Sequence, residues 1–275
     1  MPDRSIVESL AYVNWALLFS LSLGTLATVV LLRWRTEATR GYLTFTAFCA
    51  TVFALLAALL DGGLPAPADL AVHAAPAIDP VRHAGLLALA VLAGAEMVSR
   101  ARTTRRPWFG LAGLGVGVVV ALAAGLGWGD ATLPGLAWAV QLLMLAAASG
   151  GVVAAMILGH WYLVTPRIPG TPLIVATRAL TAVVAVQLVL FVVWAVLGSG
   201  TDAPFAALVG SQAFVVWLRL LVSLVFPLVL TVMALRTAGT RSMESATGLL
   251  YIDTAAILAG TIVAAALLFG TGLLV

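Results

Sequence analysis

Eight long apolar stretches follow one another along the whole chain. A helix rises about 1.5 Å per residue, so about 20 apolar residues cross the roughly 30 Å hydrocarbon core of a bilayer. Of the 275 residues, 63% are hydrophobic and only 9% are charged, which is not the composition of a soluble protein. The sequence therefore predicts an all-α polytopic membrane protein, a bundle of eight transmembrane helices in which residues 1–275 form a single integral membrane domain.

The boundaries of these stretches give the expected spans. They are 6–32, 41–60, 78–99, 108–128, 134–162, 172–198, 208–235 and 245–273. The first stretch is too long for the apolar core of a signal peptide, so we expect it to remain as a span. Pro227 lies inside the seventh span and predicts a kink there, because proline removes a backbone N–H from the helix ladder.

All fourteen basic residues are arginine, and their positions predict the orientation of the chain. Ten of them follow the odd-numbered spans: Arg33, Arg35, Arg40, Arg100, Arg102, Arg105, Arg106, Arg167, Arg236 and Arg241. Only Arg4 and Arg82 fall on the other side. Short loops rich in arginine remain in the cytoplasm. We therefore expect a bacterial-type inner membrane protein with both termini outside the cytoplasm.

Tryptophans near the span ends suggest a belt at each membrane surface, since indole rings favour the interface. Those at cytoplasmic ends are Trp34, Trp108 and Trp161; those toward outer ends are Trp128, Trp138, Trp194 and Trp217. Small residues at four-residue spacing predict close helix contacts. The clearest sets are Gly113/Gly117, Ala147/Gly151/Ala155 and Ala256/Gly260/Ala264.

The absence of lysine and the single cysteine exclude several functions. A retinal Schiff base and a Walker A phosphate loop both need lysine. With Cys49 alone, the chain cannot form an internal disulfide, a cysteine-ligated iron–sulfur cluster or a C-x-x-C-H haem attachment. A bis-histidine haem b is not expected either, because His83 and His160 fall near opposite membrane faces. No covalently bound cofactor is expected.

One group of polar residues lies at the cytoplasmic side of the spans. Its members are Glu96, His160, Tyr162, Arg178, Arg241, Glu244, Tyr251 and Asp253. Asp253 follows Met243 by ten residues, which is about 15 Å along a helix. Such a group can bind a quinone head group or relay protons. The alternative interpretation is interfacial, with Arg178 and Arg241 reaching toward the headgroups and Glu96 paired with Arg178.

A second polar group lies at the outer side. It contains Glu8, Asn14, Asp61, His73, Asp79, Arg82 and His83, and Gln212 and Arg219 extend it. The irregular spacing of His73, Asp79 and His83 makes them weak candidates for a metal site. We expect the 61–83 connection to cap the bundle and dock a partner. Arg219 needs a carboxylate within the membrane, and Glu8 or Asp253 could form this intramembrane ion pair.

The topology and the stretch Leu249–Gly270, LLYIDTAAILAGTIVAAALLFG, resemble the eight-helix quinol-interacting membrane anchors of the DMSO-reductase and NrfD type. In that family an acidic and a basic residue tend to follow the L-A-G, whereas Thr261 and Ala264–Ala266 stand there in this chain. No functional residue is therefore carried over. The resemblance implies a membrane anchor that contacts quinone and redox subunits.

These features lead to one main functional hypothesis and two alternatives. The main hypothesis is a non-catalytic integral membrane subunit that anchors a respiratory or electron-transfer complex and lines a quinone or proton site. Its expected partners are the lipid bilayer and other membrane or peripheral redox subunits, not nucleic acid. The first alternative is a stand-alone transporter or channel for a small solute or ion. The second is a membrane enzyme for lipid or isoprenoid substrates.

Overall fold

All the regular secondary structure in the described part of the chain is helical. The computed structural model describes residues 4–67, 70–99, 107–129, 133–165, 168–201 and 203–275, with side chains from Ser9 onward. Eight helices in these ranges are long and apolar enough to cross a membrane. The protein is thus an all-helical bundle compatible with a polytopic membrane protein.

The observed helices agree closely with the spans expected from the sequence. They are α1 (Arg4–Arg35), α2 (Arg40–Asp61), α3 (Asp79–Val98), α4 (Trp108–Trp128), α5 (Leu133–Val164), α6 (Thr171–Leu197), the composite α7 (Ala213–Leu220), η3 (Leu221–Val225) and α8 (Phe226–Gly239), and α9 (Met243–Thr271). The seventh span begins later than expected, at Ala213 instead of residue 208, because Ala206–Leu208 form a separate 3₁₀ turn, η2.

The sequence predicts a kink at Pro227 in the seventh span, and the feature that the structure shows there is a change of helix type. The segment η3 is a π-helical turn that directly precedes Phe226 and Pro227. Proline has no backbone N–H to donate to the preceding turn, and a π turn accommodates the resulting mismatch in the hydrogen-bond ladder. π turns inside α-helices are frequent at functional sites.

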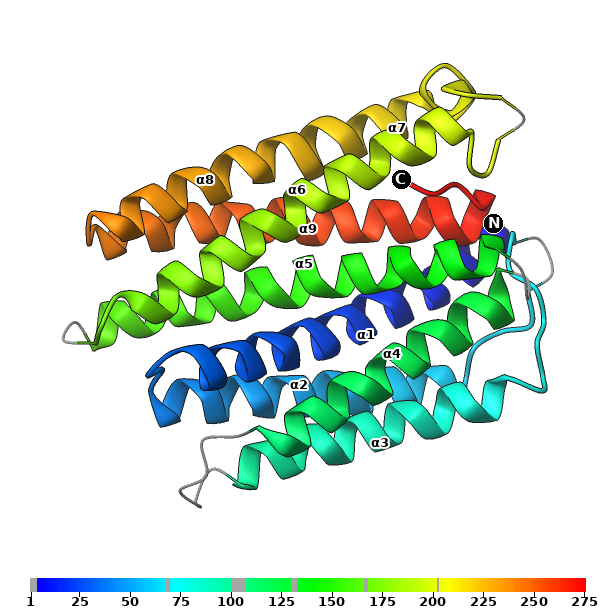
Figure 1. Cartoon of the computed structure of the whole chain (residues 1–275). Coiled ribbons are helices and arrows are strands. Elements are labelled where there is room, and N and C mark those ends of the chain that lie inside the picture. Colours follow the sequence, from blue (N-terminus) through cyan, green and yellow to red (C-terminus); the bar gives the residue numbers. More distant parts are fainter. Residues whose placement is uncertain (1–3, 68–69, 100–106, 130–132, 166–167, 202) are drawn as a thin grey trace.

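The helices form two halves with the same pattern of neighbours (Figure 1). In the N-terminal half, α1 packs on α2, α2 on α3, α3 on α4, and α4 on α1. In the C-terminal half, α5 packs on α6, α6 on α8, α8 on α9, and α9 on α5. Each half is therefore a ring of four antiparallel spans joined by short connections, as in an up-and-down bundle.

The two halves meet along α1 and α5, which make the most extensive helix contact in the molecule. Gly24 and Gly150 allow this approach. A Cβ on Gly24 would lie 1.9 Å from the Ala146 carbonyl oxygen, and one on Gly150 would lie 2.3 Å from the Thr25 backbone nitrogen. The expected small-residue contacts also occur, since Gly113 and Gly117 face Leu26 and Leu23 of α1. Small residues thus bring the backbones together, as in membrane helix pairs.

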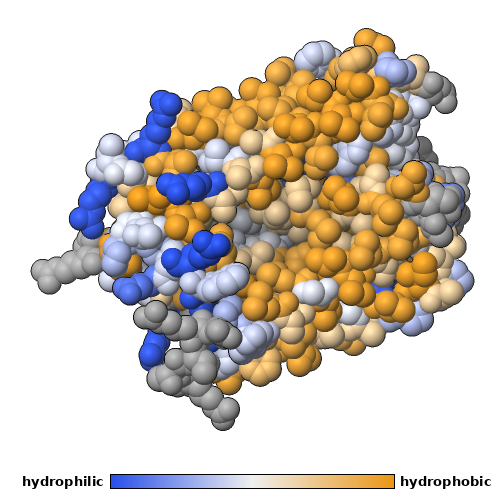
Figure 2. Space-filling view, in the orientation of Figure 1, coloured by the Kyte–Doolittle hydropathy of each residue, from blue (hydrophilic) through white to orange (hydrophobic). Residues whose placement is uncertain are grey.

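The two ends of the bundle differ in polarity. The C-terminal ends of α1, α3, α5 and α8 and the N-terminal ends of α2, α4, α6 and α9 lie at one end, here called the arginine-rich end, and the start of α1 and the end of α9 lie at the opposite end, the termini end (Figure 1). Figure 2 shows hydrophilic side chains at the arginine-rich end and a broad hydrophobic surface over the rest of the visible face. Many of the arginines that predict the orientation lie outside the described side chains: Arg4, Arg100, Arg102, Arg105, Arg106 and Arg167. The placement of both termini outside the cytoplasm stays a prediction.

The tryptophans form only part of the expected belt. Trp34, Trp108 and Trp217 are exposed, but Trp128, Trp138 and Trp194 are buried. The prediction of an outer belt was therefore wrong for these three. Instead, Trp128 packs among other rings, with ring centroids 4.7 Å from Trp15, 5.3 Å from Tyr12 and 5.5 Å from Phe269. Edge-to-face contacts of this kind favour burial over the interface.

Candidate functional site

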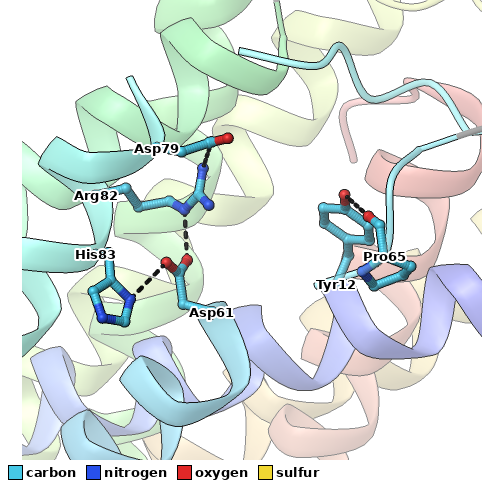
Figure 3. A network of polar contacts seen from close by, with 6 residues as sticks. All are labelled: Tyr12, Asp61, Pro65, Asp79, Arg82 and His83. Atoms are coloured by element: carbon cyan, nitrogen blue, oxygen red, sulfur yellow. Dashed lines mark hydrogen bonds and ion pairs between the residues drawn. The ribbon is translucent and has the colours of Figure 1, made fainter. Parts of the chain in front are cut away.

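Four charged or titratable side chains form a network at the termini end (Figure 3). Asp61 ends α2, and Arg82 lies in the first turn of α3. Arg82 Nε donates to Asp61 Oδ1 at 2.6 Å, and its Nη1 donates to Asp79 Oδ1 at 2.6 Å. His83 Nδ1 lies 3.2 Å from the other Asp61 oxygen. Because the side chains of Asp61 and Arg82 are almost fully buried, each compensates the charge of the other.

This network borders a pocket of about 540 Å³ beneath the 62–80 connection. The Arg82 guanidinium also lies 4.4 Å from the ring centre of Trp128, which forms part of the pocket wall. Tyr12 lines the pocket too, and its hydroxyl donates to the Pro65 carbonyl at 2.8 Å. The connection is fixed again where the His73 backbone N–H donates to the Trp128 carbonyl at 2.8 Å. The expected cap on the bundle therefore exists; whether it docks a partner stays a prediction.

The outer polar group is only partly assembled in this pocket. Asp61, His73, Asp79, Arg82 and His83 all line it, whereas Asn14 is exposed on α1 and Gln212 lines a separate surface pocket. The side chain of Glu8 lies outside the described residues. Within the described chain, no three His, Cys, Asp or Glu side chains converge as metal ligands, so His73, Asp79 and His83 do not form the metal site considered above.

At the arginine-rich end, Glu96 is separated from the rest of its predicted group. Its carboxylate forms an ion pair with Arg33 and accepts the Gly110 backbone N–H at 3.1 Å. Glu96 is fully buried, and Arg33 nearly so. The expected pairing of Glu96 with Arg178 was wrong, because α3 lies in the N-terminal half and Arg178 is exposed on α6 in the other half.

His160 and Tyr251 meet across α5 and α9. The Tyr251 hydroxyl lies 3.1 Å from His160 Nδ1, and both side chains are exposed on the bundle surface. Tyr251 follows the start of α9 by eight residues, about 12 Å along the helix. His160 precedes the end of α5 by four residues, about 6 Å, so the pair lies one to two turns from the arginine-rich end of these spans.

The remaining members of the cytoplasmic group lie near this pair but not in one cluster. Tyr162 donates to the Pro169 carbonyl and lines a pocket of about 380 Å³ with Arg241 and Glu244. Asp253 lies two residues from Tyr251 and points into the bundle, because residues two apart on a helix face opposite sides.

Arg219 and Asp253 are both buried in the C-terminal half, with exposed fractions of 2% and 0%. Arg219 Nε and both Asp253 carboxylate oxygens make no hydrogen bond within the described residues. The expected ion pair between them is not formed there. A Cβ on Gly260 would lie 3.0 Å from Arg219 Nη1, so the guanidinium lies beside Gly260, seven residues along α9 from Asp253.

Sequence reasoning missed several residues at these sites. Tyr12 and Trp128 carried no polar signal of their own, and Arg33 was assigned only to orientation. Gln187 was also missed, although a buried amide inside a span is a default functional candidate. Its Nε2 has no hydrogen-bond partner in the described chain.

Comparison with protein-family models, with curated proteins and with solved structures finds no match. The resemblance to quinol-interacting anchors therefore rests on the topology and on Leu249–Gly270. His83 and His160 lie at opposite ends of the bundle, on α3 near its start and on α5 near its end.

Proposed function

We propose that this integral membrane protein is a subunit of a membrane electron-transfer complex, and that His160 and Tyr251 bind the head group of a quinone. The observation that carries the proposal is the hydrogen-bonded pair on the outer surface of the bundle at the depth of a span. Lipid tails offer no hydrogen-bond partners, so polar groups on such a surface favour contact with a polar ligand or another subunit.

The chemistry of the pair suits a quinone. When Tyr251 donates to His160 Nδ1, the ring proton lies on Nε2, which is then able to donate to a carbonyl oxygen. A quinone head group offers two such oxygens, and its isoprenoid tail partitions into lipid beside the exposed pair. Imidazole titrates near neutral pH and is a common proton donor and acceptor.

The partners follow from the redox chemistry. Reduction of a quinone to a quinol takes two electrons and two protons, and a redox subunit beside this chain would supply the electrons. The exposed polar residues at the arginine-rich end, among them Arg178, Arg241 and Glu244, offer charged groups for such a partner. The anchoring role stays part of the proposal.

Quinone binding tests the proposal directly. The protein is purified in mild detergent, and the affinity for a short-chain ubiquinone is measured for the wild type, His160→Ala and Tyr251→Phe. Loss of one hydrogen bond costs about 0.5–1.5 kcal/mol, so Kd should rise roughly two- to tenfold in each variant.

The matched control is His73→Ala, which removes an exposed imidazole at the opposite end of the bundle. It should leave quinone affinity unchanged. Absence of quinone binding in the wild type, or equal affinity in all three variants and the wild type, would contradict the proposal. Redox subunits that co-purify with the chain would support its place in a complex.

A second candidate function is stand-alone transport of a small ion. Arg219 and Asp253 favour it, because Arg219 Nε and both Asp253 oxygens have no hydrogen-bond partner among the described residues and ionisable residues inside membrane spans mark ion and proton pathways by default. A purified chain that moves ions without any other subunit would favour this function over the first.

A further inference from the structure

A polar stripe runs along the seventh span inside the C-terminal half. Arg219, Ser223, Pro227 and Thr231 follow one another at intervals of four residues through α7, η3 and α8, and all four are buried. Four-residue spacing places side chains on one face of a helix. The stripe therefore continues through the π turn and faces the interior of the four-span ring.

Helix α9 completes this polar interior from the opposite side. A Cβ on Gly260 would lie 2.6 Å from Ser223 Oγ, so the stripe and α9 are in close contact at that level. Asp253 precedes Gly260 by seven residues, which is close to two turns, so both lie on the same face. Their separation along α9 is about 10 Å.

Unpartnered polar atoms occur in this interior. Four of the eight buried side-chain atoms without a hydrogen bond in the described chain belong to the C-terminal residues Arg219 (Nε), Gln187 (Nε2, on α6) and Asp253 (both oxygens); the other four are on Trp15, Ser20, Thr39 and Thr177. Ser149 of α5 and Thr261 of α9 lie at the same level as Gly260, with their hydroxyl oxygens 2.6 Å apart. Buried polar groups are rarely left unpaired in proteins unless they serve a ligand, water or chemistry.

The two charged groups, Arg219 and Asp253, lie at different depths along the C-terminal half. Arg219 follows the start of α7 by six residues, about 9 Å from the termini end of the span. Asp253 follows the start of α9 by ten residues, about 15 Å from the arginine-rich end. Ser223 lies on the stripe between these two levels, whereas Thr231, eight residues before the end of α8 and so about 12 Å from the arginine-rich end, lies close to the level of Asp253.

We infer that the C-terminal half conducts protons, with Asp253 as the group that binds and releases the transferred proton. The inference extends the second candidate function by naming the ion, and it does not depend on quinone binding. In each cycle the Asp253 carboxyl gives its proton toward one membrane face and receives another from the opposite face, and water entering this interior would have to bridge the distances between Asp253 and the hydroxyls of the stripe.

The fixed cation explains why the ion is a proton. A metal cation that enters the same interior would meet the positive charge of Arg219 in a medium of low dielectric constant, where like charges repel strongly. A proton can instead move from oxygen to oxygen along hydrogen bonds, so that no free cation has to sit next to the Arg219 guanidinium. Arg219 would also attract the carboxylate left at Asp253, about two helix turns away along α9, without contacting it.

Proton flux into liposomes tests the inference. The purified chain is reconstituted with a trapped pH-sensitive dye, and a potassium gradient with valinomycin drives protons inward. The wild type should acidify the lumen faster than protein-free vesicles, and Asp253→Asn should fall to the rate of those vesicles. Asp79→Asn, a carboxyl change outside the stripe, should keep the wild-type rate. Wild-type flux equal to protein-free vesicles, or undiminished flux in Asp253→Asn, would overturn the inference.

A chemical probe gives a second readout. Dicyclohexylcarbodiimide is an apolar reagent that modifies protonated carboxyl groups within membranes. It should label Asp253 in the wild type and block flux, and peptide mass mapping should locate the adduct. If Asp253→Asn does not fold, Asp253→Glu should retain both flux and labelling. A wild type that conducts protons while Asp253 stays unlabelled would also overturn the assignment.

Discussion

The third span of each half carries a buried arginine, and the two arginines differ in whether carboxylates of the described chain pair with them. Arg82 of α3 contacts two carboxylates and the face of Trp128. Arg219 of α7 has an unpartnered Nε and forms no ion pair within the described chain. The two halves share a pattern of neighbouring helices, so this difference arises from a few side chains. The buried arginine of the N-terminal half is thus paired with carboxylates, whereas that of the C-terminal half is not paired within the described chain, which is the contrast on which the proposed proton transport rests.

The largest expected effect comes from breaking a pair in the N-terminal half. Glu96→Gln leaves the nearly buried Arg33 without its carboxylate, and loss of one partner of a buried pair costs about 3–5 kcal/mol. Unfolding in mixed detergent and SDS micelles measures the change. The double variant Arg33→Leu with Glu96→Leu should recover much of the loss. Equal stability of Glu96→Gln and the wild type would show that the pair contributes little.

A smaller effect is expected where the two halves meet. In Gly24→Ala the new methyl group would lie 1.9 Å from a backbone oxygen of α5, so α1 and α5 must move apart. Overpacking of this kind costs about 1–3 kcal/mol. Gly115→Ala is the matched control, because a Cβ there has no neighbour within 4 Å. Equal thermal stability of the two variants would argue against close contact between the halves.

The smallest effect should come from the exposed edge of the paired network. Asp79 is about half exposed, and water weakens its interaction with Arg82. Pairs of this kind contribute about 0–1 kcal/mol, so Asp79→Asn should change the unfolding free energy by no more than that. A loss as large as that of Glu96→Gln would mean that Asp79 compensates the charge of Arg82 as much as Asp61 does.

The helices could be predicted from the sequence because their cause is local. About twenty consecutive apolar residues predict a span whatever its neighbours are, and the single residue Pro227 predicts an irregular helix around its position. The charge partners could not be predicted, because they depend on which spans become neighbours. Arg33 and Glu96 are 63 residues apart, and only the packing of the N-terminal half brings them together.

The burial of individual side chains also depends on which spans become neighbours, so it could not be predicted from the sequence either. Trp128 lies at a span end in the sequence, which favours the interface, yet Tyr12, Trp15 and Phe269 surround it. His160 and Tyr251 were both candidates, but their contact required α5 and α9 to be adjacent. Asp253 was recognisable from its depth alone, since a carboxyl that far into a span has few structural explanations.

Replacement of each arginine by leucine tests the contrast between the halves most directly. Arg82→Leu leaves the buried Asp61 carboxylate with the half-exposed His83 as its remaining partner and should lower the free energy of unfolding by about 3–5 kcal/mol. Arg219→Leu removes a buried charge that has no paired carboxylate among the described side chains and should leave stability unchanged or raise it. Both variants are unfolded beside the wild type in the same micelles. A clear loss for Arg82→Leu alone is the predicted result, and equal losses for both variants would contradict the account.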